Sequence, residues 1–171
     1  GKTLALAAQM KNKGRIVACD VMERRLKQGQ KRYKKAGIHN IDIKPLASER
    51  DPWIKRQKNK FDRVLVDAPC SGTGTWRRAP NARWDGLGPD LKTLTALQAS
   101  ILESTARLVK AGGRLVYATC SLLPEENEIQ IMRFLDNHPD FKLCPVQDIA
   151  PKEVNLPDTG DYLALTPAQH G

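Results

Sequence analysis

Three short apolar runs, each ending at a polar residue, limit the folds open to this chain more than any other feature of its sequence. They are RIVACD (15–20), FDRVLVD (61–67) and GRLVYATC (113–120), and the second has three apolar residues in direct succession. Runs without an alternating polar face predict strands that are buried on both sides. Longer segments with helical periodicity separate these runs. The sequence therefore predicts an α/β fold with a mostly parallel sheet.

Four segments have the spacing of apolar residues that is typical of amphipathic helices: 3–12, 22–37, 90–110 and 124–139. Gly37 is expected to end the second helix, and Gly112-Gly113 the third. Asp51-Pro52-Trp53 predicts a short helical turn, because proline suits the first position of a helix. We expect a long loop over 68–89 and further strands at NIDIKPL (40–46), FKLCPV (141–146) and DYLALTP (161–167).

Length and composition predict one domain. The chain has 171 residues, 40% of them hydrophobic and 27% charged, which suffices for a domain with its own core. No apolar run approaches the roughly 20 residues that a membrane helix needs, and no signal peptide precedes the first helix. We therefore expect a cytoplasmic protein with no membrane partner. The first residue is Gly1 rather than Met, so we also expect a piece of a longer protein.

Four cysteines lie far apart in the sequence: Cys19, Cys70, Cys120 and Cys144. No Cys-x-x-Cys pair and no Cys/His pair with finger spacing occurs, so no metal site is expected. Without an export signal, disulfides are not expected either. The cysteines are interpreted as free thiols in a reducing compartment, some of them plain core residues.

The formal net charge is +9, with 28 Lys and Arg against 19 Asp and Glu. This excess favours a polyanionic partner such as nucleic acid, although a basic surface that only serves solubility is the alternative. The charge is uneven along the chain. It concentrates in 24–35, in 55–63 and in three arginines near a glycine-rich turn: Arg77, Arg78 and Arg83.

Ligands of α/β proteins bind at the carboxyl ends of the strands, which selects three places in this chain. They are Asp20, the turn from Asp67 to Gly74, and Thr119-Cys120-Ser121. A carboxylate such as that of Asp20 suits the ribose hydroxyls of a nucleoside cofactor, but a helix N-cap explains it equally well.

Gly1-Lys2-Thr3 lies where the turn between a first strand and a first helix is expected. A phosphate loop also ends in Gly-Lys-Thr, so a nucleotide hydrolase is a third alternative. That motif needs another glycine five residues before Gly1, outside this sequence.

Cys70 and Cys120 each follow a predicted strand, so adjacent parallel strands would bring both thiols to one crevice. Three roles are open for such a pair: packing in the core, a redox pair, or catalysis in which one thiol is the nucleophile and the other assists it. Two thiols at strand ends, together with a cofactor-type acid, favour catalysis. Helix N-termini and arginines lower a thiol pKa, and Arg77 and Arg78 are the candidates here.

Several segments together resemble one family. DAPCSGTGTWRR, the ARWD after it, RLVYATCSLLPEENE and the closing GDYLALTPAQHG are similar to the Nol/Nop/Sun family of RNA cytosine-5 methyltransferases, and within it to the bacterial RsmB type. The resemblance implies a Rossmann-like class I S-adenosylmethionine-dependent methyltransferase sheet. It implies one catalytic domain over 1–171, truncated at both ends, because the family pattern has a strand before Gly1 and another after Gly171. We expect such a fragment to bind its cofactor weakly.

The family pattern also implies roles for particular residues. Cys120 would attack C6 of a cytosine and activate C5 for methyl transfer from S-adenosylmethionine. Cys70 would assist proton removal from C5 and release. Asp67 would lie between cofactor and base.

The cofactor would contact Gly1 and Lys2 at the glycine loop and Asp20 at the ribose. Ala47 stands where the family has an aspartate near the adenine, which puts that contact in doubt; Ser48 and Glu49 are the candidates to replace it.

The expected partner is RNA, and ribosomal RNA by the RsmB resemblance. Arg77, Arg78, Arg83 and the basic helix 22–37 would hold its phosphates. We expect a monomer. The alternative function is an RNA-binding fragment of such an enzyme without turnover.

Overall fold

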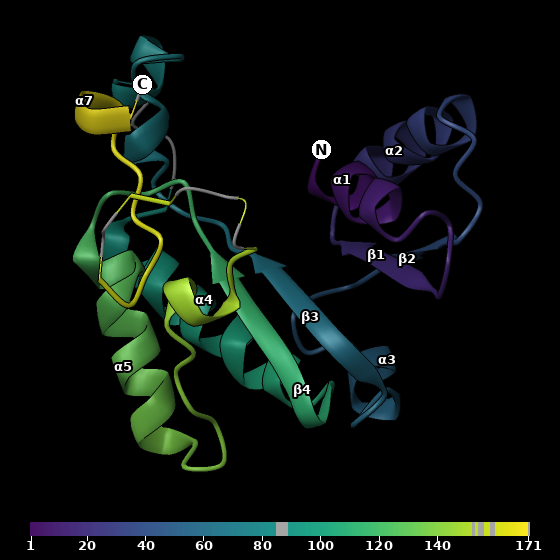
Figure 1. The fold of residues 1–171 in the computed structure, drawn as a ribbon. Coiled ribbons are helices and arrows are strands. Elements are labelled where there is room, and N and C mark those ends of the chain that lie inside the picture. The colour runs from purple at the N-terminus through teal and green to yellow at the C-terminus, as the bar shows by residue number, and fades with distance from the viewer. Residues whose placement is uncertain (85–88, 152, 154–155, 158–159, 171) are drawn as a thin grey trace. The chain divides into compact units, whose positions relative to one another are not determined.

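The apolar runs at 15–20 and 61–67 each form a strand, as the sequence predicts, and each strand is paired in parallel with another one. The computed structural model describes residues 1–84, 89–151, 153, 156–157 and 160–170. The chain divides into two units, Gly1–Gln57 and Lys58–Gly171, which are described separately. Each unit contains one pair of parallel strands (Figure 1). The prediction of parallel α/β pairing is confirmed, whereas a single catalytic domain over the whole chain stays a prediction.

The first unit is built around the parallel strands β1 (Ile16–Asp20) and β2 (Ile41–Pro45), with Ile16 opposite Ile41. Its helices are α1 (Lys2–Gln9), α2 (Glu23–Lys35) and α3 (Pro52–Arg56). Asp51 accepts a hydrogen bond from the Trp53 amide at 2.7 Å, which caps α3 at the predicted turn. Each helix buries one apolar residue: Ala7, Leu26 and Ile54.

The second unit is built around β3 (Phe61–Asp67) and β4 (Val109–Ala118), also parallel. Its longer helices are α4 (Leu91–Ala106) and α5 (Glu128–Asn137). The shorter helical segments are η1 (Thr73–Thr75), η2 (Pro80–Arg83), η3 (Pro124–Glu126), α6 (Val146–Ile149) and α7 (Pro167–His170).

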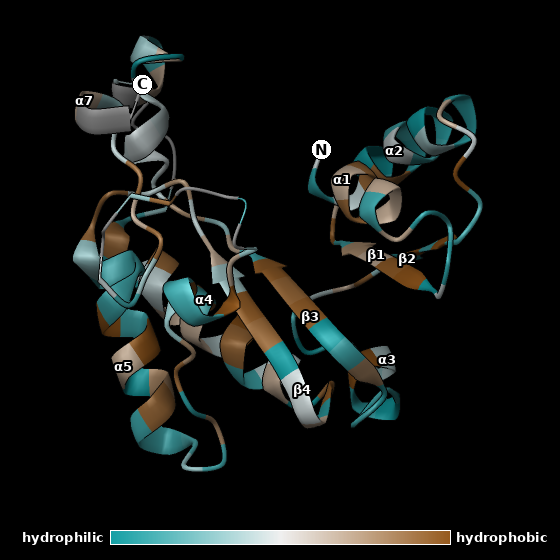
Figure 2. Cartoon of the chain, viewed as in Figure 1, coloured by the Kyte–Doolittle hydropathy of each residue, from teal (hydrophilic) through white to brown (hydrophobic). Residues whose placement is uncertain are grey.

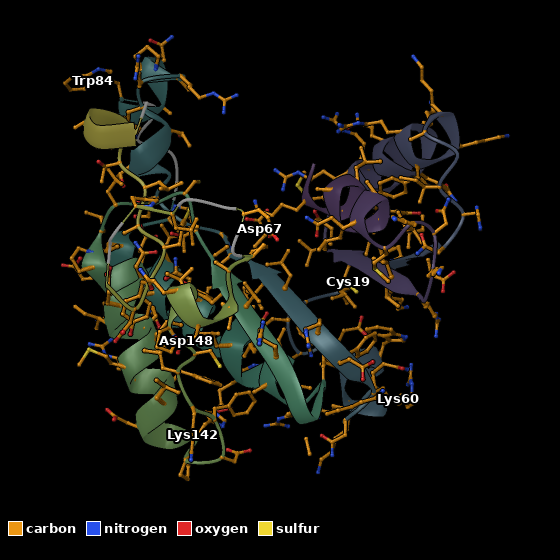
Figure 3. The ribbon with its side chains drawn as sticks, viewed as in Figure 1. Cys19, Lys60, Asp67, Trp84, Lys142 and Asp148 are labelled. Carbon is orange, nitrogen blue, oxygen red and sulfur yellow. The ribbon has the colours of Figure 1, made fainter. Side chains whose placement is uncertain are left out.

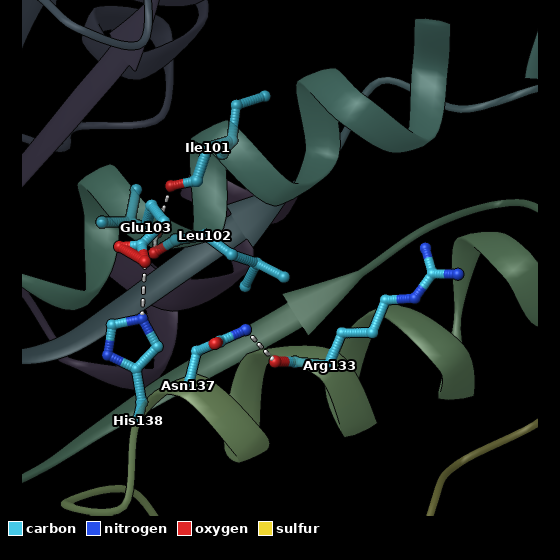
Figure 4. A network of polar contacts seen from close by, with 7 residues as sticks. Ile101, Leu102, Glu103, Arg133, Asn137 and His138 are labelled. Carbon is cyan, nitrogen blue, oxygen red and sulfur yellow. Dashed lines mark hydrogen bonds and ion pairs between the residues drawn. The ribbon is translucent and has the colours of Figure 1, made fainter. Parts of the chain in front are cut away.

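The core of the second unit forms where α4 packs on the strands and α5 packs on α4. Leu102, Ala106 and Phe134 are buried there, against Leu115 and Tyr117 of β4. Figure 2 shows that β3 and β4 each contain an apolar stretch. At the end of α5, the His138 ring stacks on Phe134, and its Nε2 lies 3.0 Å from Oε1 of Glu103 on α4 (Figure 4). This polar contact joins the two helices beside their apolar interface.

Part of this strand pair is exposed, which corrects the prediction that 61–67 is buried on both sides. Val66 is buried opposite Tyr117, on the face that packs against the helices. Leu65 and Val116 are also opposite each other but remain 39% and 40% exposed. Alternate residues of a strand point to opposite faces, so helices on one side bury only every second position.

The predicted helix 90–110 is too long. α4 ends at Ala106, and β4 already begins at Val109, opposite Phe61. Gly112-Gly113 therefore lies inside a strand, at a register irregularity, rather than after a helix. The residues from Val109 onward form a strand rather than the predicted helix, because each paired residue makes its backbone hydrogen bonds across the sheet.

The predicted strands at 141–146 and 161–167 are wrong. Both segments are irregular, and α6 and α7 begin at their final residues. The amide of Val146 donates to the Asp161 carbonyl at 3.0 Å, but neither segment is paired in a strand ladder among the described residues. Apolar composition alone does not make a strand where no neighbouring strand offers partners. The predicted helix 124–139 is likewise interrupted, because η3 gives way to α5 at Asn127.

Within the part of the chain that is described, no helix has both the length and the apolar character needed to cross a membrane.

Candidate functional site

Cys70 and Cys120 lie side by side, as the placement of both residues after adjacent strands predicts. β3 and β4 are parallel neighbours, with Asp67 opposite Ala118, so the segments after them leave the sheet at the same edge. The two sulfur atoms are 3.3 Å apart, and the Cys120 amide donates to the Cys70 sulfur at 3.4 Å. Cys70 is half-buried and Cys120 is exposed. The pair is thus close enough to share a proton and open enough to meet another molecule.

The surroundings of Cys120 favour the protonated thiol. Desolvation, the hydrogen bond to Cys70, the charge of Cys70 and the charge of Asp67 raise the Cys120 pKa to about 11. The expectation that Arg77 and Arg78 lower this pKa is wrong: both side chains are exposed, and the groups that act on Cys120 are sulfur and carboxylate. A nucleophilic role for Cys120 therefore requires that its proton pass to another group as the sulfur attacks.

Glycines let the loop after Cys70 lie against the end of β4. The Gly74 amide donates to the Cys120 carbonyl at 2.9 Å. A Cβ atom on Gly74 would lie 2.8 Å from the same oxygen, so a side chain here would push the two segments apart. Gly72 has φ +69°, a left-handed conformation that glycine adopts without strain. The Thr73 hydroxyl accepts from the Leu122 amide at 2.7 Å and so adds a further link between the segments.

The residues after each cysteine are also paired. The hydroxyls of Ser71 and Ser121 are 3.1 Å apart, next to the sulfur pair. Beneath them lies Glu126, which is fully buried in η3. Its Oε1 accepts from the Ser71 amide at 2.9 Å and from Gln98 Nε2 at 2.9 Å. Its Oε2 accepts from the Ser71 hydroxyl at 2.5 Å.

The pKa of Glu126 is lowered by this arrangement. Burial acts to raise the pKa, but the hydrogen bonds from Ser121, Ser71 and Gln98 together lower it. Sequence reasoning missed Glu126 and Gln98, because the segments 90–110 and 124–139 are predicted only as amphipathic helices. Two adjacent acids, Glu125 and Glu126, a few residues after a cysteine at a strand end are the signal that could have found Glu126.

Asp67, labelled in Figure 3, is the last residue of β3 and is exposed. It is paired with Ala118, so it lies at the edge that the segments carrying the two cysteines leave. Its charge contributes to the raised pKa of Cys120, so the carboxylate acts on the Cys120 thiol. The structure thus brings Asp67, Cys70 and Cys120 together in the second unit.

The other predicted cofactor residues belong to the first unit: Gly1, Lys2, Asp20 and Ala47. Asp20 ends β1, and its Oδ1 accepts from the Met22 amide at 2.8 Å, while Oδ2 lies 3.9 Å from Arg25 Nη1. The Asp20 carboxylate thus holds the turn before α2, but the N-cap of α2 is Met22 and no side chain caps it, so the N-cap alternative for Asp20 is wrong. The Ala47 amide donates to Asp51 Oδ2 at 2.9 Å. How these residues lie relative to the two thiols stays a prediction.

The predicted RNA-binding arginines follow η1. The side chains of Arg77 and Arg78 are exposed, and Trp84 nearby is 78% exposed. Arg83 ends η2, and its side chain lies outside the described residues. Among the residues that the structure describes, no group of three or more His, Cys, Asp or Glu side chains could hold a metal ion.

Comparisons with known proteins show that the chain is similar to ribosomal RNA methyltransferases. The family model described as 16S rRNA methyltransferase RsmB/F matches residues 1–171. A probable ribosomal RNA small subunit methyltransferase B of Synechocystis sp. is 38% identical over 170 residues, which are 99% of this chain and 38% of that protein. The chain therefore spans less than half the length of this curated relative.

Two solved structures are also similar to the chain. PH0851 is 39% identical with a TM-score of 0.87, and the match covers 99% of this chain and 37% of that one. NSun6 from Pyrococcus horikoshii, solved with the S-adenosylmethionine analogue SFG, is 28% identical with a TM-score of 0.68. That match covers 80% of this chain and 34% of NSun6.

Proposed function

Because the chain belongs to the 16S rRNA methyltransferase RsmB/F family, we propose that it transfers a methyl group from S-adenosylmethionine to C5 of a cytosine in RNA. The observation that carries this proposal is the 3.3 Å separation of the Cys70 and Cys120 sulfur atoms at one strand edge. The RNA that the family description favours is small-subunit ribosomal RNA.

Carbon 5 of cytosine is a poor nucleophile until a group adds to C6, and a thiolate can both add and leave. In the proposed reaction the Cys120 sulfur bonds to C6 as the Cys120 proton passes to an acceptor. Bound S-adenosylmethionine supplies an electrophilic methyl group for C5. A base then removes the C5 proton, the electron pair re-forms the C5–C6 double bond, and the C6–S bond breaks.

The geometry supports a division of these roles. Cys120 is the exposed thiol and suits the attack, whereas Cys70 is half-buried and held by the Cys120 amide. The Cys70 sulfur, 3.3 Å from the Cys120 sulfur, suits the later removal of the C5 proton and so the release of the methylated cytosine. Asp67 would hold the exocyclic amine of the base or the cofactor at the same edge.

The first unit would hold the cofactor. One oxygen of Asp20 is used by the Met22 amide, and the other keeps acceptor capacity for ribose hydroxyls, since its nearest cation is 3.9 Å away. Ala47 has no side-chain acceptor for the adenine amine, so its proposed role is limited to apolar contact. Gly1 and Lys2, at the start of α1, would face the methionine end.

RNA phosphates would bind the exposed Arg77 and Arg78, with Arg83 as a further candidate. A target cytosine must leave its base stack to reach Cys120, at a cost of a few kcal/mol that single-stranded RNA reduces.

The decisive experiment is transfer of a labelled methyl group from S-adenosylmethionine to 16S ribosomal RNA by the purified protein. We expect label in 5-methylcytosine and none with C120S. RNA binding without transfer would instead support the alternative of a catalytically inactive RNA-binding protein.

A further inference from the structure

A buried carboxylate binds the residue that follows Cys70. Glu126 is fully buried, and three hydrogen bonds from Ser71 and Gln98 reach its two oxygens at 2.5–2.9 Å. Burying a charge without hydrogen-bond partners costs free energy. The hydrogen bonds to the Glu126 carboxylate are therefore strong, and losing any of them is unfavourable. The network around Glu126 should therefore be rigid.

The same network includes the residues on both sides of Cys70 and the residue directly after Cys120. Gln98 Nε2 donates to the carbonyl of Pro69, the residue before Cys70, at 2.8 Å. Ser71, the residue after Cys70, contacts both Glu126 and Ser121, and Ser121 directly follows Cys120. A single carboxylate thus connects α4, the loop after β3 and the segment after β4.

We propose that Glu126 is a positioning residue that sets the separation of the Cys70 and Cys120 sulfur atoms. It touches neither sulfur and acts through Ser71 and Ser121, the residues that follow the two cysteines. That this separation matters for catalysis rests on the proposed methyltransferase function. That Glu126 sets the separation does not depend on that function. Reactions between held groups are sensitive to placement, and a shift of about 1 Å can lower a rate by about a hundredfold.

The rate of disulfide formation between the two thiols measures their proximity without any substrate. The assay uses the purified protein with C19S and C144S, so that Cys70 and Cys120 are the remaining thiols. Diamide accepts two electrons and two protons as the S–S bond forms. Differential alkylation and mass spectrometry then follow the reaction, and a non-reducing gel excludes bonds between molecules. We expect E126A to slow this reaction by about tenfold.

The slower rate cannot come from the protonation of the thiols. Removing a nearby negative charge lowers a thiol pKa, which increases the thiolate fraction and by itself would speed the reaction. E126Q is the conservative variant, because its amide oxygen can still accept from the Ser71 amide and Gln98 while its NH₂ donates to the Ser71 hydroxyl. We expect E126Q to stay within about twofold of the background.

Gln130 provides the matched control. It is 2% exposed and donates from Nε2 to the Thr95 carbonyl at 2.8 Å, without contacting either cysteine segment. Q130A loses a buried hydrogen bond of the second unit and should leave the disulfide rate unchanged. If E126A does not fold, S71A removes the Oε2 partner of Glu126 and should slow the reaction instead.

A folded E126A variant that forms the disulfide as fast as the background would overturn the proposal. Methyl transfer is the second measurement: E126A should lower kcat while KM for RNA stays the same. If the protein transfers no methyl group at all, the proposed function fails, yet the disulfide rates still decide the role of Glu126.

Discussion

The Gly74 amide donates a hydrogen bond to the Cys120 carbonyl at 2.9 Å, and the Cα of Gly74 faces that oxygen so closely that a Cβ would lie 2.8 Å from it. This contact joins the loop after β3 to the end of β4 at the cysteine pair. It leaves no room for any other residue at position 74.

G74A should therefore destabilise the protein and separate the two segments. Overpacking of this kind costs about 1–3 kcal/mol, because backbone has to move to relieve the clash. Urea denaturation followed by fluorescence measures the loss. An unchanged midpoint would show that the loop adjusts freely and that the close approach is not required.

The raised pKa of Cys120 predicts how its reactivity depends on pH. The thiol is protonated below about pH 11, so alkylation by iodoacetamide should continue to accelerate with pH up to that value. Desolvation is the largest cause, and the hydrogen bond and charge of Cys70 come next. C70S should therefore lower the Cys120 pKa and speed alkylation at pH 8, measured by mass spectrometry. Equal rates in both proteins would contradict the coupling of the two thiols.

The proposed division of roles predicts opposite effects for the two cysteines. If Cys120 forms the bond to cytosine and Cys70 assists release, C70S should accumulate a covalent protein–RNA adduct. C120S should form none. A denaturing gel with labelled RNA resolves the adduct, and its appearance in C120S but not in C70S would reverse the two assignments.

The lowered pKa of Glu126 predicts a loss of stability in acid. A carboxyl with a depressed pKa in the folded state stabilises the protein above its unfolded pKa, and this contribution is lost as pH falls through the folded pKa. The effect should begin below the ordinary carboxyl pKa of about 4.3. E126Q should flatten that part of the curve of unfolding free energy against pH. Parallel curves for the two proteins would show that Glu126 is not ionised in the folded state.

Leu102 is 1% exposed at the centre of the core between α4 and α5. L102A should lower the free energy of unfolding by about 2–5 kcal/mol, because it removes buried apolar contacts and leaves a cavity. M132A is the control on α5, where Met132 is 60% exposed, and should have little effect. Equal losses in both variants would mean that this helix interface is not the core of the second unit.

The sequence by itself determined the parts of the protein that depend on local patterns. Continuous apolar runs predicted the strands that become β1 and β3, and Asp51-Pro52 predicted the capped start of α3. Placement after two parallel strands also predicted that Cys70 and Cys120 meet. In each case the relevant interaction is local, or follows from the way parallel strands end at one edge.

Only the tertiary structure decided the rest. β4 extends back to Val109 because Phe61 offers it a partner, and the apolar segment 141–146 is not a strand because no neighbouring strand is paired with it among the described residues. The Cys120 pKa rises because of desolvation, the facing Cys70 sulfur and Asp67. Glu126 gains its role from Gln98 and Ser71, which are 28 and 55 positions away. Burial, strand pairing and electrostatic effects at such sites depend on residues that are far apart in the chain. Local sequence patterns do not show which of these residues come close together in space.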